Sequence, residues 1–295
     1  MLKVENLSKS YQGQEVVKGV SFELKANTAT ALIGPNGAGK TTILSMLAGL
    51  LEPTNGSIKI QGVKKIQAEI GFLPQYPKFF EALTAKEFIE MCGNLSGMNK
   101  TAIQKRTEEV FAFVGLTDAM NKKTSTFSGG MKQRLGIAQA IFHKPRLLLL
   151  DEPVSALDPV GRREMMDLLK QLQQQTTILY STHILNDAEQ MTDEVLFIKD
   201  GSLVEQGSLL EVKRKYADDE LHVYVETHEN ADQFMQLAPF QTITDDMKII
   251  IKREHDVPTM QELLQFITTL PFEVVKIEKQ SASLEQIFMK VARSI

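Results

Sequence analysis

Cysteine, tryptophan, long apolar runs and an excess of basic charge are all scarce or absent in this 295-residue sequence. The single cysteine, Cys92, excludes an internal disulfide framework and indicates a reducing compartment. No apolar run approaches the roughly 20 residues that a membrane-spanning helix needs, and the alternating N-terminal residues 1–7 indicate a strand rather than a signal peptide. The formal net charge of −4 argues against nucleic acid as the main partner. If the chain serves a membrane, we expect it to do so through another protein.

A glycine-rich loop between an apolar run and a helix-forming segment is the clearest local signal. The pattern G-x-x-x-x-G-K-T follows the apolar run 29–33 and precedes a helix expected over 41–50. Glycines let successive backbone N–H groups turn toward a phosphate chain, and the helix N-terminus adds positive potential. Lys40 would reach the β- and γ-phosphates and the Thr41 hydroxyl would bind Mg²⁺. The predicted nucleotide-binding residues here are Gly34, Pro35, Asn36, Gly37, Ala38, Gly39, Lys40, Thr41 and Thr42.

Two adjacent carboxylates end another apolar run. Residues 147–150 are four leucines followed by Asp151 and Glu152, a pattern that suits a central parallel strand buried on both faces. Two carboxylates at such a place are costly unless something positive meets them, and Mg²⁺ with a nucleotide is the obvious candidate. An acidic turn without a ligand is the alternative for this stretch taken alone.

Three further residues are candidates for ligand contacts. Gln75 follows a strand expected over 69–73, and His183 follows one expected over 176–181. Strand ends beside a nucleotide site commonly supply ligand contacts. Tyr11 lies in a polar connection, where its ring either packs on the sheet or stacks on a base; from the residues alone, packing is favoured.

Residues 77–145 change character and read as a helical block inserted between two parts of a sheet. Thr84 opens a capping box, residues 103–114 form a second helical pattern, and Ser128 opens a third helix that ends before Pro145. Beyond residue 207 no glycine occurs, and the expected order βαββαβ, followed by one more helix, is that of a ferredoxin-like split βαβ module.

Seven motifs, taken in order, resemble those of the ATP-binding cassette (ABC) ATPases, and the resemblance covers residues 1 to about 207. They are the aromatic A-loop residue Tyr11, Walker A at Gly34–Thr41, the Q-loop residue Gln75, the signature at Phe127–Met131, Walker B with its adjacent glutamate at Leu147–Glu152, the D-loop at Ser155–Asp158 and the H-loop residue His183. The signature departs from the family pattern, because Phe127 replaces Leu and Met131 replaces Gln. The serine and both glycines that would meet phosphate are intact.

The resemblance implies an α/β fold with a P-loop NTPase core, the ABC ATPase domain, over 1–208. A helical subdomain would be inserted at about 77–145, and a small α+β accessory domain would follow over 209–295. Two cassettes would sandwich two ATP molecules, with Mg²⁺ as the metal cofactor. The second cassette would be an identical chain or a related one.

The resemblance also implies a role for each site residue. Glu152 would act as general base, His183 would hold the γ-phosphate, and Gln75 would sense the metal and link the site to the helical block. Tyr11 would stack on the base, and Asp158 would couple the two sites across the dimer. The residues implied to hold Mg²⁺ are Thr41, Gln75 and Asp151. The residues implied to contact the partner's ATP are Ser128, Gly129 and Gly130.

Transport is the function that these features favour. A permease in a separate chain would carry the cargo, and the ATPase would sit at the cytoplasmic face of the cell membrane through that permease. The ending Ser283–Phe288 and the altered signature look like bacterial ATPases of ABC-2-type exporters, which mostly move antibiotics, lipids, polysaccharides or ions. The alternative is a non-transport ABC ATPase acting on ribosomes or DNA. A single cassette, with no coiled-coil insertion and no basic stripe, disfavours it.

The C-terminal module has two interpretations. It either binds a small regulator or only extends the contact with the dimer or the permease, and the second is favoured because a fold alone does not establish a function. Its histidines, His222, His228 and His255, are scattered, which favours surface positions over metal ligation.

Overall fold

The computed structural model describes residues 1–217, 220–253, 257–280 and 282–293. Its contacts divide the chain into two compact units, the first formed by Met1–Leu210 with the residues from Val291 onward, and the second by Glu211–Lys290. Each unit is described by itself. Among the described residues no helix is both long and apolar enough to cross a bilayer.

A six-stranded sheet forms the centre of the first unit. Its order is β5-β6-β7-β3-β8-β9, in which all neighbours run parallel except the antiparallel pair β8 and β9. The strands are β3 (Ala29–Ile33), β5 (Ile70–Leu73), β6 (Leu147–Asp151), β7 (Thr177–Thr182), β8 (Glu194–Lys199) and β9 (Ser202–Ser208). Every residue of β3, β6 and β7 is buried, as expected for apolar runs covered on both faces.

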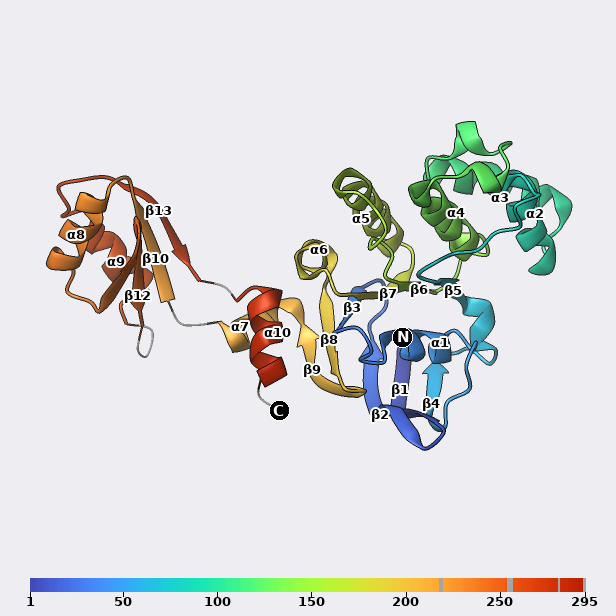
Figure 1. Ribbon diagram of the computed structural model, residues 1–295, viewed down its shortest axis with the longest axis horizontal. Helices are drawn as coiled ribbons and strands as arrows, with labels where there is room; N and C mark the ends of the chain where they lie inside the picture. The colour runs from blue at the N-terminus through green and yellow to red at the C-terminus, as the bar shows by residue number, and fades with distance from the viewer. Residues whose placement is uncertain (218–219, 254–256, 281, 294–295) are drawn as a thin grey trace. The chain divides into compact units, whose positions relative to one another are not determined.

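Helices cover both faces of this sheet (Figure 1). One face carries α5 (Pro159–Gln173) and α6 (Leu185–Met191), and the other carries α1 (Lys40–Leu47). The helix after the glycine loop is shorter than the expected 41–50. It ends at Leu47, two residues before Gly49, whose φ of 72° is the left-handed conformation that commonly follows a helix end.

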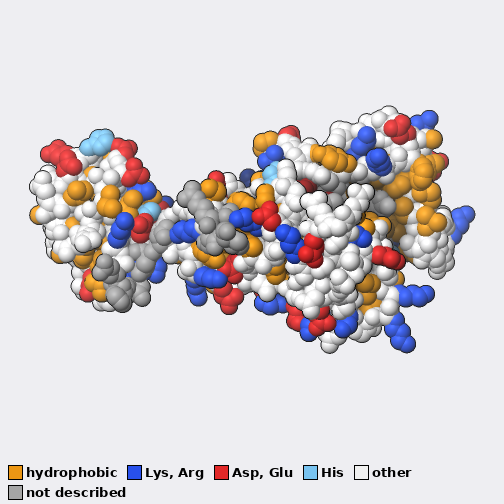
Figure 2. All heavy atoms as spheres, turned by 60° about the horizontal axis from the view of Figure 1, so that its bottom comes forward, with side chains coloured by type: hydrophobic (Ala, Val, Ile, Leu, Met, Phe, Trp, Pro, Cys, Tyr) orange, Lys and Arg blue, Asp and Glu red, His pale blue; other side chains and the backbone are white. Residues whose placement is uncertain are grey.

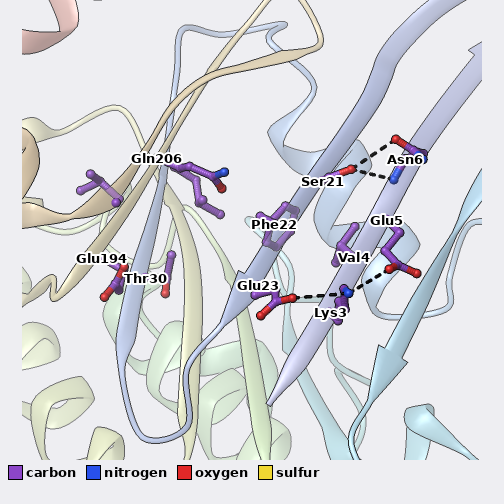
Figure 3. A pocket seen from close by; sticks show the side chains of 13 residues that line it. Lys3, Val4, Glu5, Asn6, Ser21, Phe22, Glu23, Thr30, Glu194 and Gln206 are labelled. Carbon is purple, nitrogen blue, oxygen red and sulfur yellow. Dashed lines mark hydrogen bonds and ion pairs between the residues drawn. The ribbon is translucent and has the colours of Figure 1, made fainter.

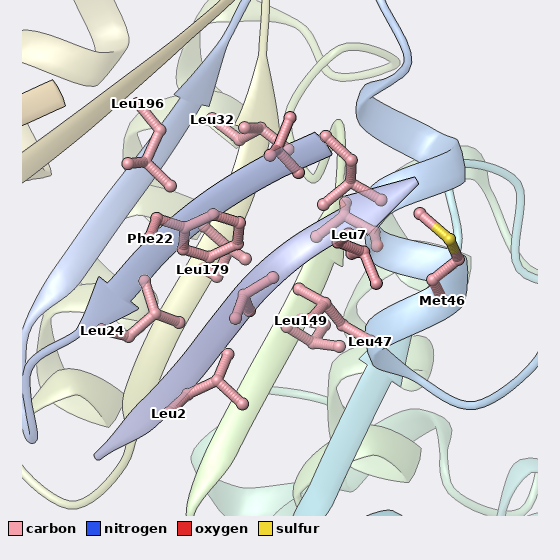
Figure 4. Packing of buried hydrophobic residues seen from close by; sticks show 14 of the residues in the cluster. Leu2, Leu7, Phe22, Leu24, Leu32, Met46, Leu47, Leu149, Leu179 and Leu196 are labelled. Atoms are coloured by element: carbon pink, nitrogen blue, oxygen red, sulfur yellow. The ribbon is translucent and has the colours of Figure 1, made fainter. Parts of the chain in front are cut away.

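A three-stranded antiparallel sheet lies over α1. Its order is β2-β1-β4, formed by β1 (Leu2–Tyr11), β2 (Gln14–Leu24) and β4 (Asn55–Ile60). Figure 4 shows Leu7 and Phe22 of this sheet in one apolar cluster with Leu149 and Leu179 of the central sheet and Leu47 of α1. Because α1 is held between two sheets by this core, the loop that precedes it has a fixed position.

The helical segment comes between β5 and β6. It contains α2 (Ala85–Leu95), α3 (Lys100–Phe113) and α4 (Gly129–Ile141), and each begins at the side-chain cap that its sequence provides, namely Thr84, Asn99 and Ser128. Helix α4 lies directly on β5, where a Cβ atom built on Gly71 would come within 2.1 Å of the Ala140 carbonyl oxygen. This close approach fixes α4 against the strand that leads to Gln75.

The second unit contains a four-stranded antiparallel sheet with the order β11-β12-β10-β13. Figure 1 shows α8 (His228–Leu237) and α9 (Met260–Ile267) on one side of this sheet, and their apolar residues share a core with the sheet. The strands are β10 (Glu220–Val225), β11 (Thr242–Asp245), β12 (Lys248–Lys252) and β13 (Val274–Lys279). This arrangement is the predicted ferredoxin-like one. Helices α7 (Leu209–Tyr216) and α10 (Leu284–Arg293) precede and follow it.

Candidate phosphate-binding site

The carboxyl ends of four parallel strands bring the predicted residues to one edge of the central sheet. The glycine loop follows β3, Gln75 follows β5, Asp151 and Glu152 end β6, and His183 follows β7. Parallel strands present their carboxyl ends at the same edge, so residues more than 100 positions apart in the sequence become neighbours.

A pocket of about 210 Å³ lies at this edge. Gly39 has a φ of 101°, a conformation that residues with a Cβ rarely adopt, and a Cβ there would lie 3.1 Å from the Val16 carbonyl oxygen. Glycine at this position therefore allows the loop to turn into the helix. The lining residues are Val16, Pro35, Asn36, Gly37, Gly39, Lys40, Thr41, Thr42, Gln75 and Glu152.

Lys40 is the cation of the pocket. Its side chain is almost fully buried, and Nζ donates hydrogen bonds to the carbonyl oxygens of Gly34 at 2.7 Å and Pro35 at 3.1 Å. Burial lowers the pKa of Lys40, while the carboxylates of Glu152 and Asp151 act in the opposite direction. A buried ammonium facing an open pocket favours an anionic ligand.

The two carboxylates of β6 have different partners. Asp151 is buried, and its Oδ2 accepts a hydrogen bond from the Thr41 hydroxyl at 2.8 Å. Glu152 has one oxygen 2.9 Å from His183 Nδ1 and the other 3.7 Å from Lys40 Nζ. Glu152 also has a φ of 50°, which is uncommon for a glutamate and is a form of backbone strain that is often found at functional sites.

Several predicted residues lie outside the lining of this pocket. Tyr11 ends β1 with 45% of its surface exposed, and Lys9 Nζ lies 5.3 Å from its ring centroid. Ser128, the exposed N-cap of α4, accepts a hydrogen bond from the Met131 N–H at 3.3 Å. Gly129 and Gly130 form the first turn of that helix, and Asp158 caps α5 through the Gly161 N–H at 2.9 Å.

The sequence predictions missed two residues that contact the carboxylate turn. Ser181 on β7 is fully buried between Asp151 and the backbone of Glu152. Gln133 on α4 is also buried and donates a hydrogen bond to the Pro153 carbonyl oxygen at 3.0 Å. The signal that could have identified both is a polar residue inside an otherwise apolar pattern, because a buried polar group needs a hydrogen-bond partner.

A larger pocket, of about 780 Å³, lies elsewhere in the first unit, between the three-stranded sheet and β3, β8 and β9 (Figure 3). It shares no lining residue with the phosphate pocket. Lys3 forms an ion pair with Glu5 at 3.0 Å, and Lys25 forms one with Glu194. The carboxylates of Glu5 and Glu194, which line this larger pocket, are therefore paired with lysines.

The expectation of surface positions for the C-terminal histidines is wrong for His222. This residue is 5% exposed and lies on β10 with its Nε2 3.3 Å from Glu220 Oε2, whereas the His228 side chain is exposed. His255 lies outside the described residues. Within the part of the chain that the structure describes, no group of three or more His, Cys, Asp or Glu side chains could hold a metal ion.

The fold and this site together define a class of protein. A phosphate loop between a parallel strand and a helix, with a carboxylate-ended strand in the same sheet and a helical segment inserted ahead of that strand, characterises a nucleoside triphosphatase of the P-loop type.

Comparisons with known proteins identify the family. A family model described as "ABC transporter" matches residues 17–155, and one described as "ATP-binding protein DrrA1-3-like, C-terminal domain" matches residues 207–292. The uncharacterized ABC transporter ATP-binding protein YxlF of Bacillus subtilis is 42% identical, with 100% of both chains covered. The bacitracin transport ATP-binding protein BcrA of Bacillus licheniformis is 34% identical, with 99% of this chain and 97% of that one covered.

Solved structures give the same result. The dimeric post-hydrolysis state of the ATP-binding cassette MJ0796, bound to ADP and Pi, is 30% identical with a TM-score of 0.65, and the match covers 71% of this chain and 99% of that one. The chain therefore belongs to the ATP-binding proteins of ABC transporters. It is an ABC ATPase, the ATP-binding subunit of a transporter, and the predicted family and fold are confirmed.

Proposed function

We propose that this chain is the motor subunit of an exporter, in which two cassettes enclose two ATP molecules and drive a separate permease. The observation that carries this proposal is one connected cluster: Lys40, Thr41 and Glu152 line the phosphate pocket, Asp151 bonds Thr41, and His183 contacts Glu152. In the proposed mechanism catalysis comes from positioning and from charge stabilisation of phosphoryl transfer to water.

ATP would bind with its phosphates along the glycine loop. Backbone N–H groups of the loop and the N-terminus of α1 would meet the phosphate oxygens, and Lys40 would pair with the β- and γ-phosphates in place of its present carbonyl partners.

The donor set beside this loop fits Mg²⁺. The Thr41 hydroxyl and an Asp151 carboxylate oxygen lie 2.8 Å apart, and Gln75 lines the same pocket as Thr41, so side chains with the oxygen donors that Mg²⁺ prefers are present there. These residues would hold the ion. When bound, the ion would neutralise negative charge on the phosphates.

Glu152 is the proposed general base. Its carboxylate is buried beside Lys40 and would orient and polarise the attacking water. His183, within 2.9 Å of that carboxylate, would hold the γ-phosphate with the opposite side of its ring. Tyr11 would stack on the adenine, since its ring is exposed at the end of β1.

A second cassette would complete each ATP site. Ser128, Gly129 and Gly130 form an exposed helix N-terminus, a favourable place for an anion, yet none of them lines the phosphate pocket of their own chain. We propose that they contact the γ-phosphate held by a partner cassette, identical or related, and that Asp158 couples the two sites.

The permease would dock at the helical segment. Tyr76 and Phe80, which closely follow Gln75, are 70% and 62% exposed, and Leu95 at the end of α2 is 81% exposed. Figure 2 shows hydrophobic side chains gathered at the end of the first unit that carries this segment. Exposed apolar clusters of this kind mark protein contacts. Docking there would hold the ATPase at the cytoplasmic face of the cell membrane.

The proposed cargo is an antibiotic, a lipid or another amphiphile. The support is the similarity over nearly the full length to a protein described as a bacitracin transport ATP-binding protein. The C-terminal unit is proposed to extend the contact with the dimer or the permease, and no nucleic acid is expected as a partner, given the net charge of −4.

Purification of the chain from native membranes in mild detergent tests the permease assignment. We expect a polytopic membrane protein to co-purify with the chain and to be lost with Phe80→Asp. A matched control is Leu50→Asp, since Leu50 is similarly exposed, at 68%, but lies outside both the helical segment and the C-terminal unit. ATP hydrolysis by both purified variants would show that they are folded. Recovery of ribosomal proteins or DNA instead of a membrane protein would contradict the proposal.

A further inference from the structure

Ser181 connects the two carboxylates of the site. It is the penultimate residue of β7, it pairs in register with Asp151 on β6, and it is fully buried. Its hydroxyl donates to Asp151 Oδ1 at 2.6 Å and accepts from the Glu152 N–H at 2.9 Å. One hydroxyl thus contacts the side chain of the first carboxylate residue and the backbone of the second.

The first of these bonds fixes the orientation of the Asp151 carboxylate. Thr41 donates to Oδ2 at 2.8 Å, so each carboxylate oxygen has its own hydroxyl donor, one from α1 and one from β7. An O–H···O⁻ bond of 2.6 Å falls in the range of strong, charge-assisted hydrogen bonds. Without Ser181 the carboxylate could rotate about its χ2 angle.

The second bond holds an unfavourable turn. Glu152 has a φ of 50°, a left-handed conformation that a glutamate adopts only when its surroundings enforce it. The Ser155 hydroxyl, at 3.1 Å from the Glu152 carbonyl oxygen, and Gln133, at 3.0 Å from that of Pro153, also hold this turn. Of these three side chains, only Ser181 also bonds Asp151.

We infer that Ser181 is a positioning residue for ATP hydrolysis, one that sets the direction of Asp151 toward the metal ion and the place of Glu152 together. The inference rests on the roles proposed above for these two carboxylates. The hydroxyl makes both of these bonds and an apolar side chain could make neither, so the hydroxyl itself carries the function.

The decisive comparison is between Ser181→Thr and Ser181→Val, which introduce side chains of nearly the same shape with and without a hydroxyl. We expect turnover at saturating Mg²⁺ and ATP to be at least about tenfold higher for the threonine variant, on the scale of hydrogen bonds to charged groups. Ser181→Ala, which adds no bulk, should lose at least about tenfold in turnover and need more Mg²⁺ for half-maximal activity.

Two readouts separate positioning from a purely structural role. ATP binding in the presence of EDTA should be nearly unchanged in Ser181→Ala, because the loop residues that hold the phosphates are intact. The fall in melting temperature should be comparable to that of Thr177→Val, which also removes a buried hydroxyl that accepts a backbone N–H. The matched control is Thr177→Val on the same strand, whose hydroxyl accepts the Asn27 N–H at 3.0 Å far from the site. This variant should have the Mg²⁺ requirement of the parent.

Wild-type turnover and an unchanged Mg²⁺ requirement in Ser181→Ala would overturn the inference. A large drop in melting temperature, accompanied by weaker ATP binding in the absence of metal, would also overturn it, since that result indicates a structural role. If the threonine and valine variants both fail to fold, the alanine variant decides alone. Glu152→Gln measured in parallel tests the proposed function separately, because it removes the base while leaving the Ser181–Asp151 bond in place.

Discussion

Replacement of Glu152 by glutamine removes the proposed base and little else. Glutamine preserves the volume of a side chain that is only 5% exposed, and its amide can still meet His183, now 2.9 Å from the carboxylate. The negative charge 3.7 Å from Lys40 disappears, which leaves the ammonium free to pair with phosphate. We therefore expect ATP binding to be retained.

The expected loss lies in turnover. A positioned general base contributes a factor of about 10² to 10⁴, which corresponds to about 3–5 kcal/mol in the activation free energy. Asp151, the other carboxylate of the pair, is held by the hydroxyls of Thr41 and Ser181, so it could take the place of Glu152 only by losing these bonds. The loss should therefore lie toward the larger values in this range.

Phosphate release with Mg²⁺ and ATP in excess measures turnover, and titration with a fluorescent nucleotide measures binding. The matched control is Glu229→Gln, an exposed glutamate in the first turn of α8, which should behave like the parent. Hydrolysis by Glu152→Gln within about threefold of the parent, a difference under roughly 1 kcal/mol, would refute the base assignment.

Three further predictions follow from separate contacts. Ser128→Arg in one cassette of a mixed dimer should block hydrolysis at the site of its partner, and normal activity of that dimer would refute the trans arrangement. Gly71→Ala places a Cβ about 2.1 Å from the Ala140 carbonyl oxygen and should cost at least about 2 kcal/mol in thermal unfolding, whereas Gly129→Ala meets no atom within 4 Å and should leave stability unchanged. Hydrogen bonds from Thr84 lower the pKa of Glu87, so this cap stabilises the fold above the unfolded-state pKa of about 4.3 and loses that contribution as the pH falls through the lowered folded-state pKa. The difference in melting temperature between the parent and Thr84→Ala should accordingly be larger at neutral pH than near pH 3, and a difference independent of pH would contradict the role of the Glu87 charge.

Local chemistry made most of the strands and helices predictable. The apolar runs at 29–33 and 147–150 became buried central strands, and the caps at Thr84 and Ser128 begin helices where their sequence patterns place them. Boundaries were predicted less well, as in α1, which spans Lys40–Leu47 where a helix over 41–50 was expected. Helix ends depend on caps and packing as well as on periodicity.

The sequence by itself determined the family, the phosphate loop and the identity of the carboxylates, because these depend on residue types at fixed short spacings. Only the tertiary structure decided which residues contact those carboxylates. Ser181 is 30 positions from Asp151, and the register of two parallel strands alone brings their atoms to 2.6 Å. Likewise, the burial of His222 depends on what packs over β10, and no local pattern in the sequence encodes it. Contacts set by strand order and packing are long-range, and for that reason they emerge only when the chain is folded.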